Sequence, residues 1–386
     1  RLPAWFATIG IVWLTWCLAN HARGAAVARW STLVLSTMVL TYISAGAVMT
    51  DTFLVFGTTL SLVSVWFVLS GRSDYWRWWF FMGLAIGLLS KGPLAVVLTV
   101  IPLVLWAAIF RQRLQPLKKL PWLLGSLLTL AIAVPWYVLA ELKTPGFLNY
   151  FIIGEHFSRF LYPGWAGDLY GSAHDRPKGM IWIFWLWASF PWGIIGLVGF
   201  GLAAARGKTK DIFTGAVQDA STLYLLFCAI TPMLFFTLAG NTLWTYILPS
   251  LPFSAILIAG WVSKLDLGAW SRVRSGAVLL VPVLITLVVF ISVSGVIPLK
   301  TEKQLISRYE SIHQAGDSPI FYIGEMPFSA RFYSLGDAVE IISTEFNSLL
   351  EADGYARVFA VIPNHAVDEV LGPRATDAQK LGENER

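Results

Sequence analysis

Apolar runs dominate the first three quarters of the chain. A helix needs about 20 predominantly apolar residues to cross the hydrocarbon core of a membrane. Ten runs are therefore predicted as spans: 3–20, 29–48, 52–70, 76–90, 93–110, 121–141, 179–203, 221–238, 244–262 and 276–297. The fourth run is short and directly precedes the fifth, so we expect these two to form a tight hairpin that turns at SKGP.

The pattern changes after residue 297. The short β-branched or aromatic runs SPIFYIG, DAVEII and ARVFAVIP predict strands. Between them, PFSARFYSL and STEFNSLLEADG predict helices. We therefore expect two domains: an all-α polytopic membrane domain over residues 1–297, and a small extracytoplasmic α/β domain over residues 298–386. The tail has no nucleotide-binding glycine pattern, and we interpret it as a lid or a packing domain.

Composition and charge support a membrane protein. Charged residues make up 13% of the chain, against about 25% in a typical soluble domain. Residues 1–297 hold 20 basic and 9 acidic residues, whereas residues 298–386 hold 8 basic and 14 acidic residues. The basic excess is confined to short loops between spans, which is not the pattern of a nucleic-acid-binding surface.

The distribution of basic residues along the loops predicts the orientation. Alternate loops hold 14 of the 20 basic residues in the membrane part: Arg23, Arg29, Arg72, Arg77, the four in RQRLQPLKK (111–119), Arg206, Lys208, Lys210, Lys264, Arg272 and Arg274. Because basic loops stay inside, these loops are predicted to be cytoplasmic. The other face then carries MTDT, SKGP, the loop 142–178, AGNTLW and the acidic tail. Residue 1 also falls on that face, so we expect an odd number of crossings before it if the native N-terminus is cytoplasmic.

Two charged residues stand at predicted span ends on the outer face. Asp51 opens a span, where an acidic residue favours the helix dipole and can cap the helix. The functional alternative is a carboxylate at the rim of an outward cavity. Lys91 in SKGP can reach the interface as a snorkelling lysine. Because Gly92 permits close backbone approach and Pro93 suits a helix start, a phosphate contact by Lys91 is the second interpretation.

The loop 142–178 contains the sequence GEHFSRF. We expect an amphipathic interfacial or re-entrant helix there, on which Glu155 and Arg159 share a face because they are four residues apart. A surface ion pair worth about 0–1 kcal/mol is the simplest interpretation. Glu155 and His156 also suggest a divalent metal site, with His174 as a further ligand, although adjacent residues point to different sides of a helix.

Further polar and aromatic residues follow on the same face. Arg176 and Lys178 in HDRPKG precede a span, where they suit lipid headgroups. Tyr246 in NTLWTYILPSLP suits the aromatic belt of a membrane interface. Taken together, several cations and a few carboxylates on one outer face favour an anionic, phosphate-bearing lipid substrate with acid/base chemistry beside it.

The order DT, SKGP, PWY, EHFSRF, SFPW, TYILPSLP along the chain resembles the membrane glycosyltransferases of the GT-C fold. Within them it is most similar to the family of the lipid A aminoarabinose transferase, which is related to protein O-mannosyltransferases. The start RLPAWFATIG also resembles an early span of that family. The likeness covers the whole chain and is weakest in the tail.

The resemblance implies a reaction and roles for particular residues. A sugar would move from a polyprenyl-phosphate carrier to a lipid, such as lipid A, or to another acceptor outside the cytoplasm, at the periplasmic face of the bacterial inner membrane. Asp51 corresponds to a secondary acidic residue of the site. Lys91, Arg159 and Tyr246 correspond to the donor-phosphate residues, and Glu155 and His156 to the EH-x-x-RF motif that orients the site or ligates a divalent ion.

The resemblance also predicts what lies outside this sequence. The principal catalytic carboxylate of the family lies in the first large extracytoplasmic loop, before the RLP stretch. We therefore expect the first span and that loop to precede residue 1, and the chain without them to be inactive.

Other function classes remain as alternatives at this point. A polytopic transporter or lipid flippase would carry its charges near the middle of the membrane, often in broken helices. Here the charges cluster at span ends on one face, and the sequence shows no inverted repeat. A polymerase or ligase of lipid-linked glycans would share the donor and the face. The sugar, the acceptor and the metal requirement stay open.

Overall fold

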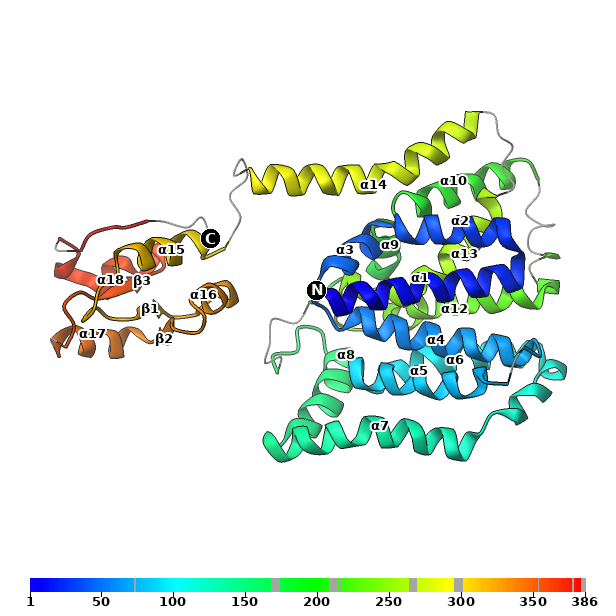
Figure 1. Cartoon of the computed structure of the whole chain (residues 1–386), viewed down its shortest axis with the longest axis horizontal. Coiled ribbons are helices and arrows are strands. Elements are labelled where there is room, and N and C mark those ends of the chain that lie inside the picture. Colours follow the sequence, from blue (N-terminus) through cyan, green and yellow to red (C-terminus); the bar gives the residue numbers. More distant parts are fainter. Residues whose placement is uncertain are drawn as a thin grey trace. The chain divides into compact units, whose positions relative to one another are not determined.

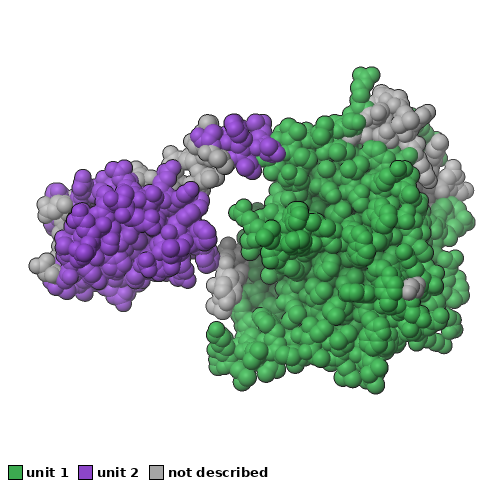
Figure 2. Space-filling model, in the orientation of Figure 1, with its two compact units in different colours: residues 1–285 green, residues 286–386 purple. Residues whose placement is uncertain are grey.

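The computed structural model describes residues 1–72, 74–167, 174–207, 214–215, 217–263, 269–294, 301–352, 354–376 and 378–382. Three of the predicted cytoplasmic basic residues, Lys208, Lys210 and Lys264, lie outside the described residues. The chain forms two compact units, Arg1–Ile285 and Thr286–Arg386, shown in different colours in Figure 2. The division falls within a helix, earlier in the chain than the boundary predicted after residue 297.

The first unit is built from helices (Figure 1). In chain order these are α1 (Leu2–Arg23), α2 (Ala25–Ser36), α3 (Val39–Gly46), α4 (Asp51–Leu69), α5 (Trp76–Lys91), α6 (Leu94–Ile109), η1 (Arg111–Arg113), η2 (Gln115–Lys119), α7 (Trp122–Lys143), η3 (Asn149–Ser158), α8 (Arg159–Leu161), α9 (Met180–Ala188), α10 (Trp192–Ala205), α12 (Ala220–Thr237), η4 (Trp244–Ser250) and α13 (Leu251–Val262). The next helix, α14 (Ala269–Val293), begins in the first unit and ends in the second. The predicted all-α polytopic membrane domain is confirmed.

The prediction of ten spans is too high for the described residues. Five helices are long and apolar enough to cross a membrane, and up to eight if each of three bent pairs is one span. The run 76–90 forms α5, whose 16 residues rise only about 24 Å at 1.5 Å per residue. The run 29–48 is broken between α2 and α3 by a bend of 65°, and the run 179–203 bends by 107° between α9 and α10.

Helix α4 is the most deeply buried of the spans, and α7 is the least. The most apolar stretch of α4 is 83% buried inside the molecule, whereas the most apolar stretch of α7 is 17% buried. Figure 1 shows α7 at the edge of the helical unit. Leu123, Leu127 and Leu130 of α7 are exposed, as expected of a helix whose apolar surface faces lipid rather than other helices.

Glycines bring α4 and α5 into close contact. A Cβ atom added to Gly57 of α4 would lie 2.6 Å from the carbonyl oxygen of Gly83 and 2.7 Å from the backbone nitrogen of Gly87, both in α5. The Ser61 hydroxyl of α4 also donates to the Phe80 carbonyl, at 2.9 Å. Small residues of this kind let two helix backbones approach in a membrane. The contact fixes how the ends of these two helices meet.

The second unit has a three-stranded parallel sheet with helices around it. Its elements are α15 (Lys303–Ile312), β1 (Ile320–Ile323), α16 (Phe328–Tyr333), β2 (Val339–Ile341), α17 (Ser343–Glu351), β3 (Phe359–Val361), η5 (Asn364–Ala366), α18 (Val367–Leu371) and η6 (Gly372–Thr376). The strand order is β2-β1-β3, with Phe321 opposite Val339 and Ala360. All three strands and both helices expected in this region are present.

Candidate active site

An ion pair joins the ends of α4 and α5. Asp51 is the first residue of α4 and Lys91 is the last residue of α5, and Asp51 Oδ1 lies 3.4 Å from Lys91 Nζ. Each charge suits its helix terminus, because acidic groups are favoured at N-termini and basic groups at C-termini. The side chains are 12% and 29% exposed. Asp51 therefore does more than open its helix, since it holds the position of the Lys91 ammonium group.

Tyr246 also lies near the Lys91 ammonium group. Lys91 Nζ is 5.8 Å from the centroid of the Tyr246 ring, within cation–π distance. The ring packs against Phe236 of α12, with 4.7 Å between ring centroids. Tyr246 belongs to η4, a 3₁₀ segment that leads directly into α13. The structure thus brings together three of the predicted site residues, Asp51, Lys91 and Tyr246, from distant parts of the sequence.

Glu155 and Arg159 form the second ion pair. Arg159 Nη1 donates to Glu155 Oε2 at 2.8 Å, and the two side chains are 17% and 19% exposed. The Tyr150 hydroxyl donates to Glu155 Oε1 at 2.6 Å. The prediction that Glu155 and Arg159 share a helix face is confirmed. The segment Asn149–Ser158 is a π-helix, however, and the α-helical part is limited to α8. Such π segments occur frequently at functional sites.

His156 connects the two ion pairs through backbone groups. Its Nδ1 lies 2.6 Å from the Phe151 carbonyl oxygen, and its Nε2 lies 2.9 Å from the Lys91 carbonyl oxygen. The last carbonyls of a helix have no partner within the helix, so His156 caps the C-terminus of α5 from a different segment.

Gly92 makes room for this connection. It follows Lys91 with φ 55° and ψ −145°, a conformation that other residues rarely adopt. A Cβ atom at this position would lie 2.8 Å from the Phe151 ring and 3.0 Å from His156 Cε1. The expected hairpin at SKGP is confirmed. The group that comes close to the backbone at Gly92 is the His156 ring.

The metal hypothesis for Glu155 and His156 is not supported by the geometry. Both ring nitrogens of His156 lie against carbonyl oxygens, and both carboxylate oxygens of Glu155 accept hydrogen bonds. Throughout the part of the chain that the structure describes, no three His, Cys, Asp or Glu side chains are grouped to hold a metal ion. The suggested third ligand, His174, belongs to no such group among the described residues.

Asn241 is an important residue that sequence reasoning did not single out. Its buried side-chain amide donates to the carbonyls of Arg159 at 2.6 Å and Tyr162 at 2.8 Å, and its Oδ1 accepts from the Gly164 amide at 3.0 Å. Asn241 also forms a β-bridge with Asp175. One side chain thus satisfies the backbone at the end of α8 and fixes Arg159 relative to the segment before η4. An asparagine in a loop gives no sequence signal of this role.

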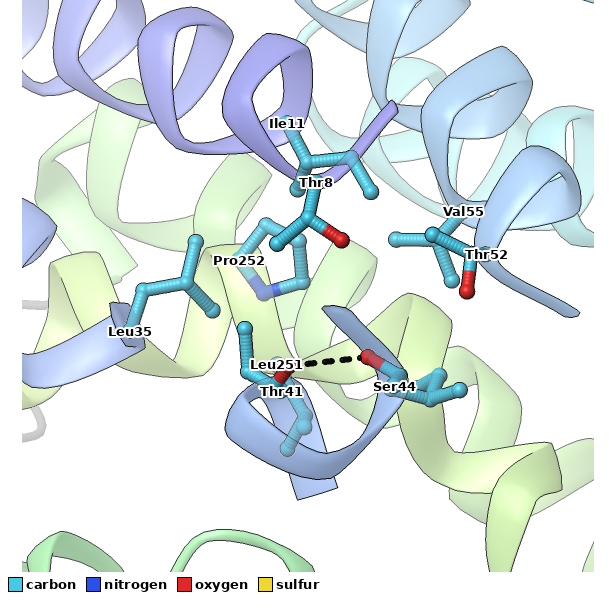
Figure 3. Close-up of a pocket in the computed structure, with 10 residues that line it drawn as sticks. Thr8, Ile11, Leu35, Thr41, Ser44, Thr52, Val55, Leu251 and Pro252 are labelled. Atoms are coloured by element: carbon cyan, nitrogen blue, oxygen red, sulfur yellow. Dashed lines mark hydrogen bonds between the residues drawn. The ribbon is translucent and has the colours of Figure 1, made fainter. Parts of the chain in front are cut away.

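A small cavity lined by apolar side chains and a few hydroxyl groups lies between α1, α3, α4 and α13, and Thr52, the residue after Asp51, lines it (Figure 3). Its hydroxyl groups come from Thr8 of α1, Thr41 and Ser44 of α3, and Thr52 of α4. The Thr41 and Thr52 hydroxyls are buried and have no hydrogen-bond partner among the described residues. The cavity volume is about 10 Å³, which is room for about one water molecule. It is too small to hold a sugar.

Comparisons with known proteins agree with this architecture. A family model described as dolichyl-phosphate-mannose-protein mannosyltransferase matches residues 1–151. An undecaprenyl phosphate-alpha-4-amino-4-deoxy-L-arabinose arabinosyl transferase of Pseudomonas fluorescens is 29% identical over 288 residues, which cover 72% of this chain and 45% of that protein. A homologue from Pectobacterium atrosepticum is 29% identical over 286 residues, 70% of this chain and 47% of that protein.

A solved structure shares the fold. The crystal structure of ArnT from Cupriavidus metallidurans bound to undecaprenyl phosphate has a TM-score of 0.73 with this chain at 15% sequence identity, covering 99% of this chain and 81% of that one. The likeness shows that the chain has the fold of that polytopic membrane protein, the GT-C fold. In sequence it is similar to the undecaprenyl phosphate-alpha-4-amino-4-deoxy-L-arabinose arabinosyl transferases, and it spans about half the length of the relatives named above. These relatives are named as transferases, not as transporters or flippases.

Proposed function

We propose that the whole protein transfers a sugar from an undecaprenyl phosphate carrier to a lipid acceptor such as lipid A. We place it in the bacterial inner membrane, with the site on the periplasmic face. The main observation in support of the proposal is a pair of cations, Lys91 and Arg159, each in an ion pair with a carboxylate. His156 connects the two ion pairs through its hydrogen bond with the Lys91 carbonyl. The names of the homologous transferases support the donor.

The charge balance of the reaction explains why two cations are useful. The acceptor oxygen attacks the anomeric carbon, and the bond from this carbon to the carrier phosphate breaks, leaving its electron pair on the phosphate. The carrier changes from a phosphodiester with one negative charge to a monoester with about 1.5 to 2 negative charges at neutral pH. Cations that face this phosphate stabilise the transition state more than the ground state.

We assign roles to the site residues on this basis. Lys91 and Arg159 bind the carrier phosphate, and the Tyr246 ring keeps the Lys91 ammonium group in place. Glu155 and His156 position Arg159 and the turn at Gly92. Asp51 aligns Lys91 before the phosphate arrives and is a secondary acidic group. A base other than these residues accepts the proton of an acceptor hydroxyl.

The test uses the full-length protein in lipid nanodiscs with an undecaprenyl-phosphate-linked aminosugar. Removing either charge with Lys91→Ala or Arg159→Ala should lower the transfer rate by at least about 100-fold, which corresponds to about 2.7 kcal/mol of transition-state stabilisation. The matched control is Arg29→Ala, which removes an exposed cation from the predicted cytoplasmic face. Folding is checked by membrane insertion and melting temperature. Transfer at the wild-type rate in both Lys91→Ala and Arg159→Ala would refute the phosphate-site assignment.

A further inference from the structure

Two buried hydroxyl groups line the cavity of Figure 3 without a hydrogen-bond partner among the described residues. They belong to Thr41 of α3, which is 5% exposed, and to Thr52 of α4, which is 1% exposed. A buried polar group that makes no hydrogen bond is destabilising, so most such groups in proteins have a partner. The residue roles proposed above use neither threonine.

The positions of the two threonines in their helices explain why the helix backbone does not satisfy them. A threonine inside a helix commonly donates to the carbonyl four residues earlier, as Thr58 does to Leu54 at 2.9 Å. Thr41 is the third residue of α3, and Thr52 is the second residue of α4. In both cases the residue four positions earlier precedes the helix. The partner of each hydroxyl therefore has to come from outside its own helix.

Two further hydroxyl groups line the same cavity, and their protons are already used. The Thr8 hydroxyl donates to the Ala4 carbonyl at 2.9 Å, and the Ser44 hydroxyl donates to the Thr41 carbonyl at 3.0 Å. A hydroxyl group has one proton to donate and two lone pairs that accept. Thr8 and Ser44 can therefore only accept a further hydrogen bond, whereas Thr41 and Thr52 can also donate one.

The size and the lining of the cavity select the ligand. The volume of about 10 Å³ suits one water molecule, which makes two to four hydrogen bonds when it is buried. Water can both donate and accept, as this mixture of hydroxyl groups requires. Burying a charge without an opposite charge is strongly unfavourable. The described residues that line the cavity carry no charged side chain, so the lining favours water over a cation.

We propose that this cavity holds one ordered water molecule, which accepts hydrogen bonds from Thr41 and Thr52 and donates hydrogen bonds to Thr8 and Ser44. These partners lie on α1, α3 and α4, so the water connects three helices. The lipid around a membrane protein offers no partners to polar groups, and a bound water supplies them from inside the fold. The inference does not depend on the proposed sugar transfer. Asp51 is the residue before Thr52, so the water fixes the turn that carries it.

A structure of the full-length protein in nanodiscs, at a resolution that shows ordered water, tests the site directly. We expect one peak of density about 2.5–3.0 Å from the Thr41 and Thr52 hydroxyl oxygens, the length of an O–H···O hydrogen bond. A map that shows other buried waters but no peak in this cavity would overturn the proposal. Several oxygen atoms at about 2.0–2.6 Å from the peak would identify a metal ion and overturn it as well.

Isosteric variants test whether the water contributes to stability. Thr41→Val and Thr52→Val each remove one hydrogen bond of the water, and each should lower the melting temperature in nanodiscs by about 2 °C. The matched control is Thr59→Val in α4. Thr59 is also buried and has no hydrogen-bond partner among the described residues, but it does not line the cavity. This control should be as stable as the wild type or more stable, because valine removes an unsatisfied group. A similar rise in all three variants would show a dry cavity and overturn the proposal.

The double variant that combines Thr41→Val with Thr52→Val tests whether the two threonines bind the same water. The effects of residues that share a partner do not add. Without both hydroxyls the water loses its two donors, while Thr8 and Ser44 keep their bonds to carbonyl groups. We therefore expect the melting temperature of the double variant to fall by less than the sum of the two single falls. Falls that add would show that the two hydroxyls act separately, and this result would overturn the shared water.

Discussion

At the scale of single residues, Gly92 occupies the most constrained position of the candidate site. It has positive φ, and the space for a Cβ atom is filled by the Phe151 and His156 rings. Gly92→Ala therefore adds backbone strain and a steric clash at once, and we expect a loss of about 1–3 kcal/mol of stability. The measurement is the melting temperature of the protein in nanodiscs.

Gly24 provides the matched control for this prediction. It also has positive φ, at 88°, but nothing lies within 4 Å of the position of its Cβ atom. Gly24→Ala therefore adds strain alone, and its melting temperature should fall less than that of Gly92→Ala. Equal losses in the two variants would show that the contact with His156 contributes nothing.

A second residue-scale prediction concerns pH and the Asp317–Arg357 pair in the second unit. The Arg357 guanidinium donates to both carboxylate oxygens of Asp317, at 3.1 and 2.6 Å. Hydrogen bonding from Arg357 lowers the pKa of Asp317 below its usual value, and the Gln314 amide adds to the effect. The Asp317 carboxylate therefore binds a proton more readily in the unfolded chain than in the folded one. The folded state gains stability from this difference above about pH 4, the ordinary pKa of Asp. That stability is lost as the pH falls through the lower pKa of Asp317 in the folded state.

Hydrogen exchange of the β1 amides in the whole chain measures this effect. Wild-type protection should fall as the pH drops below about 4, after correction for the intrinsic exchange rate. In Arg357→Gln the protection should already be lower at neutral pH and should change less on acidification. Arg331→Gln, in the same unit, is the control and should follow the wild type. An Arg357→Gln profile identical to that of the wild type would contradict the prediction.

At the scale of secondary-structure elements, the contact between α4 and α5 determines where Asp51 and Lys91 meet. A Cβ atom on Gly83 would lie 2.4 Å from Ser61 Oγ and 2.5 Å from the Gly57 carbonyl oxygen. Gly83→Ala should therefore separate the helices and cost about 1–3 kcal/mol, as overpacking does. We also expect weaker binding of undecaprenyl phosphate, because the Lys91 end of α5 moves with the helix.

The control for the helix contact is Gly201→Ala in α10, where nothing lies within 4 Å of the added atom. Alanine is the better helix former by about 0.5–1 kcal/mol, so this variant should be at least as stable as the wild type. Thermal melting and carrier binding are measured for both variants. Wild-type stability of Gly83→Ala would show that the helices accommodate the methyl group, contrary to the prediction.

The elements also show where pattern reasoning failed. The hairpin at SKGP, the strands of the tail and the Glu155–Arg159 pair follow from local spacing, and the structure confirms them. The bends between α2 and α3 and between α9 and α10, and the π-helix at Asn149–Ser158, were not expected. Hydropathy reports how apolar a segment is, and it does not report where the backbone changes direction within it.

At the scale of the whole molecule, the basic loops predict which face of the membrane carries the site. Gln112 lies in a basic loop predicted to be cytoplasmic, and Thr144 lies at the start of the loop that contains the Glu155–Arg159 pair. Both residues are exposed, and the native Cys17 and Cys228 are buried.

In intact cells with a permeable outer membrane, Thr144→Cys should react with a membrane-impermeant maleimide. Gln112→Cys should react only after the inner membrane is opened. The reverse labelling would invert the topology and place the site on the cytoplasmic face.

The sequence by itself determined the properties that depend on local composition and spacing. Apolar runs predicted a helical membrane unit, β-branched runs predicted the sheet of the tail, and loop charges predicted the orientation. The structure joins the six predicted site residues in two groups. Asp51 and Tyr246 both contact Lys91, and Glu155 pairs with Arg159. His156, next to Glu155 in the chain, connects the groups through its hydrogen bond with the Lys91 carbonyl. Their chemical types were visible in the sequence because charged residues are costly in apolar segments.

Only the tertiary structure decided how these residues are partnered. Asp51 meets Lys91 because glycines set the approach of α4 and α5, and His156 reaches the Lys91 carbonyl from 65 positions further along the chain. Asn241 fixes the end of α8 from 82 positions beyond Arg159. These partners satisfy backbone groups left open at helix ends. Which distant side chain satisfies a given helix end depends on how the helices pack, and no local pattern in the sequence specifies it.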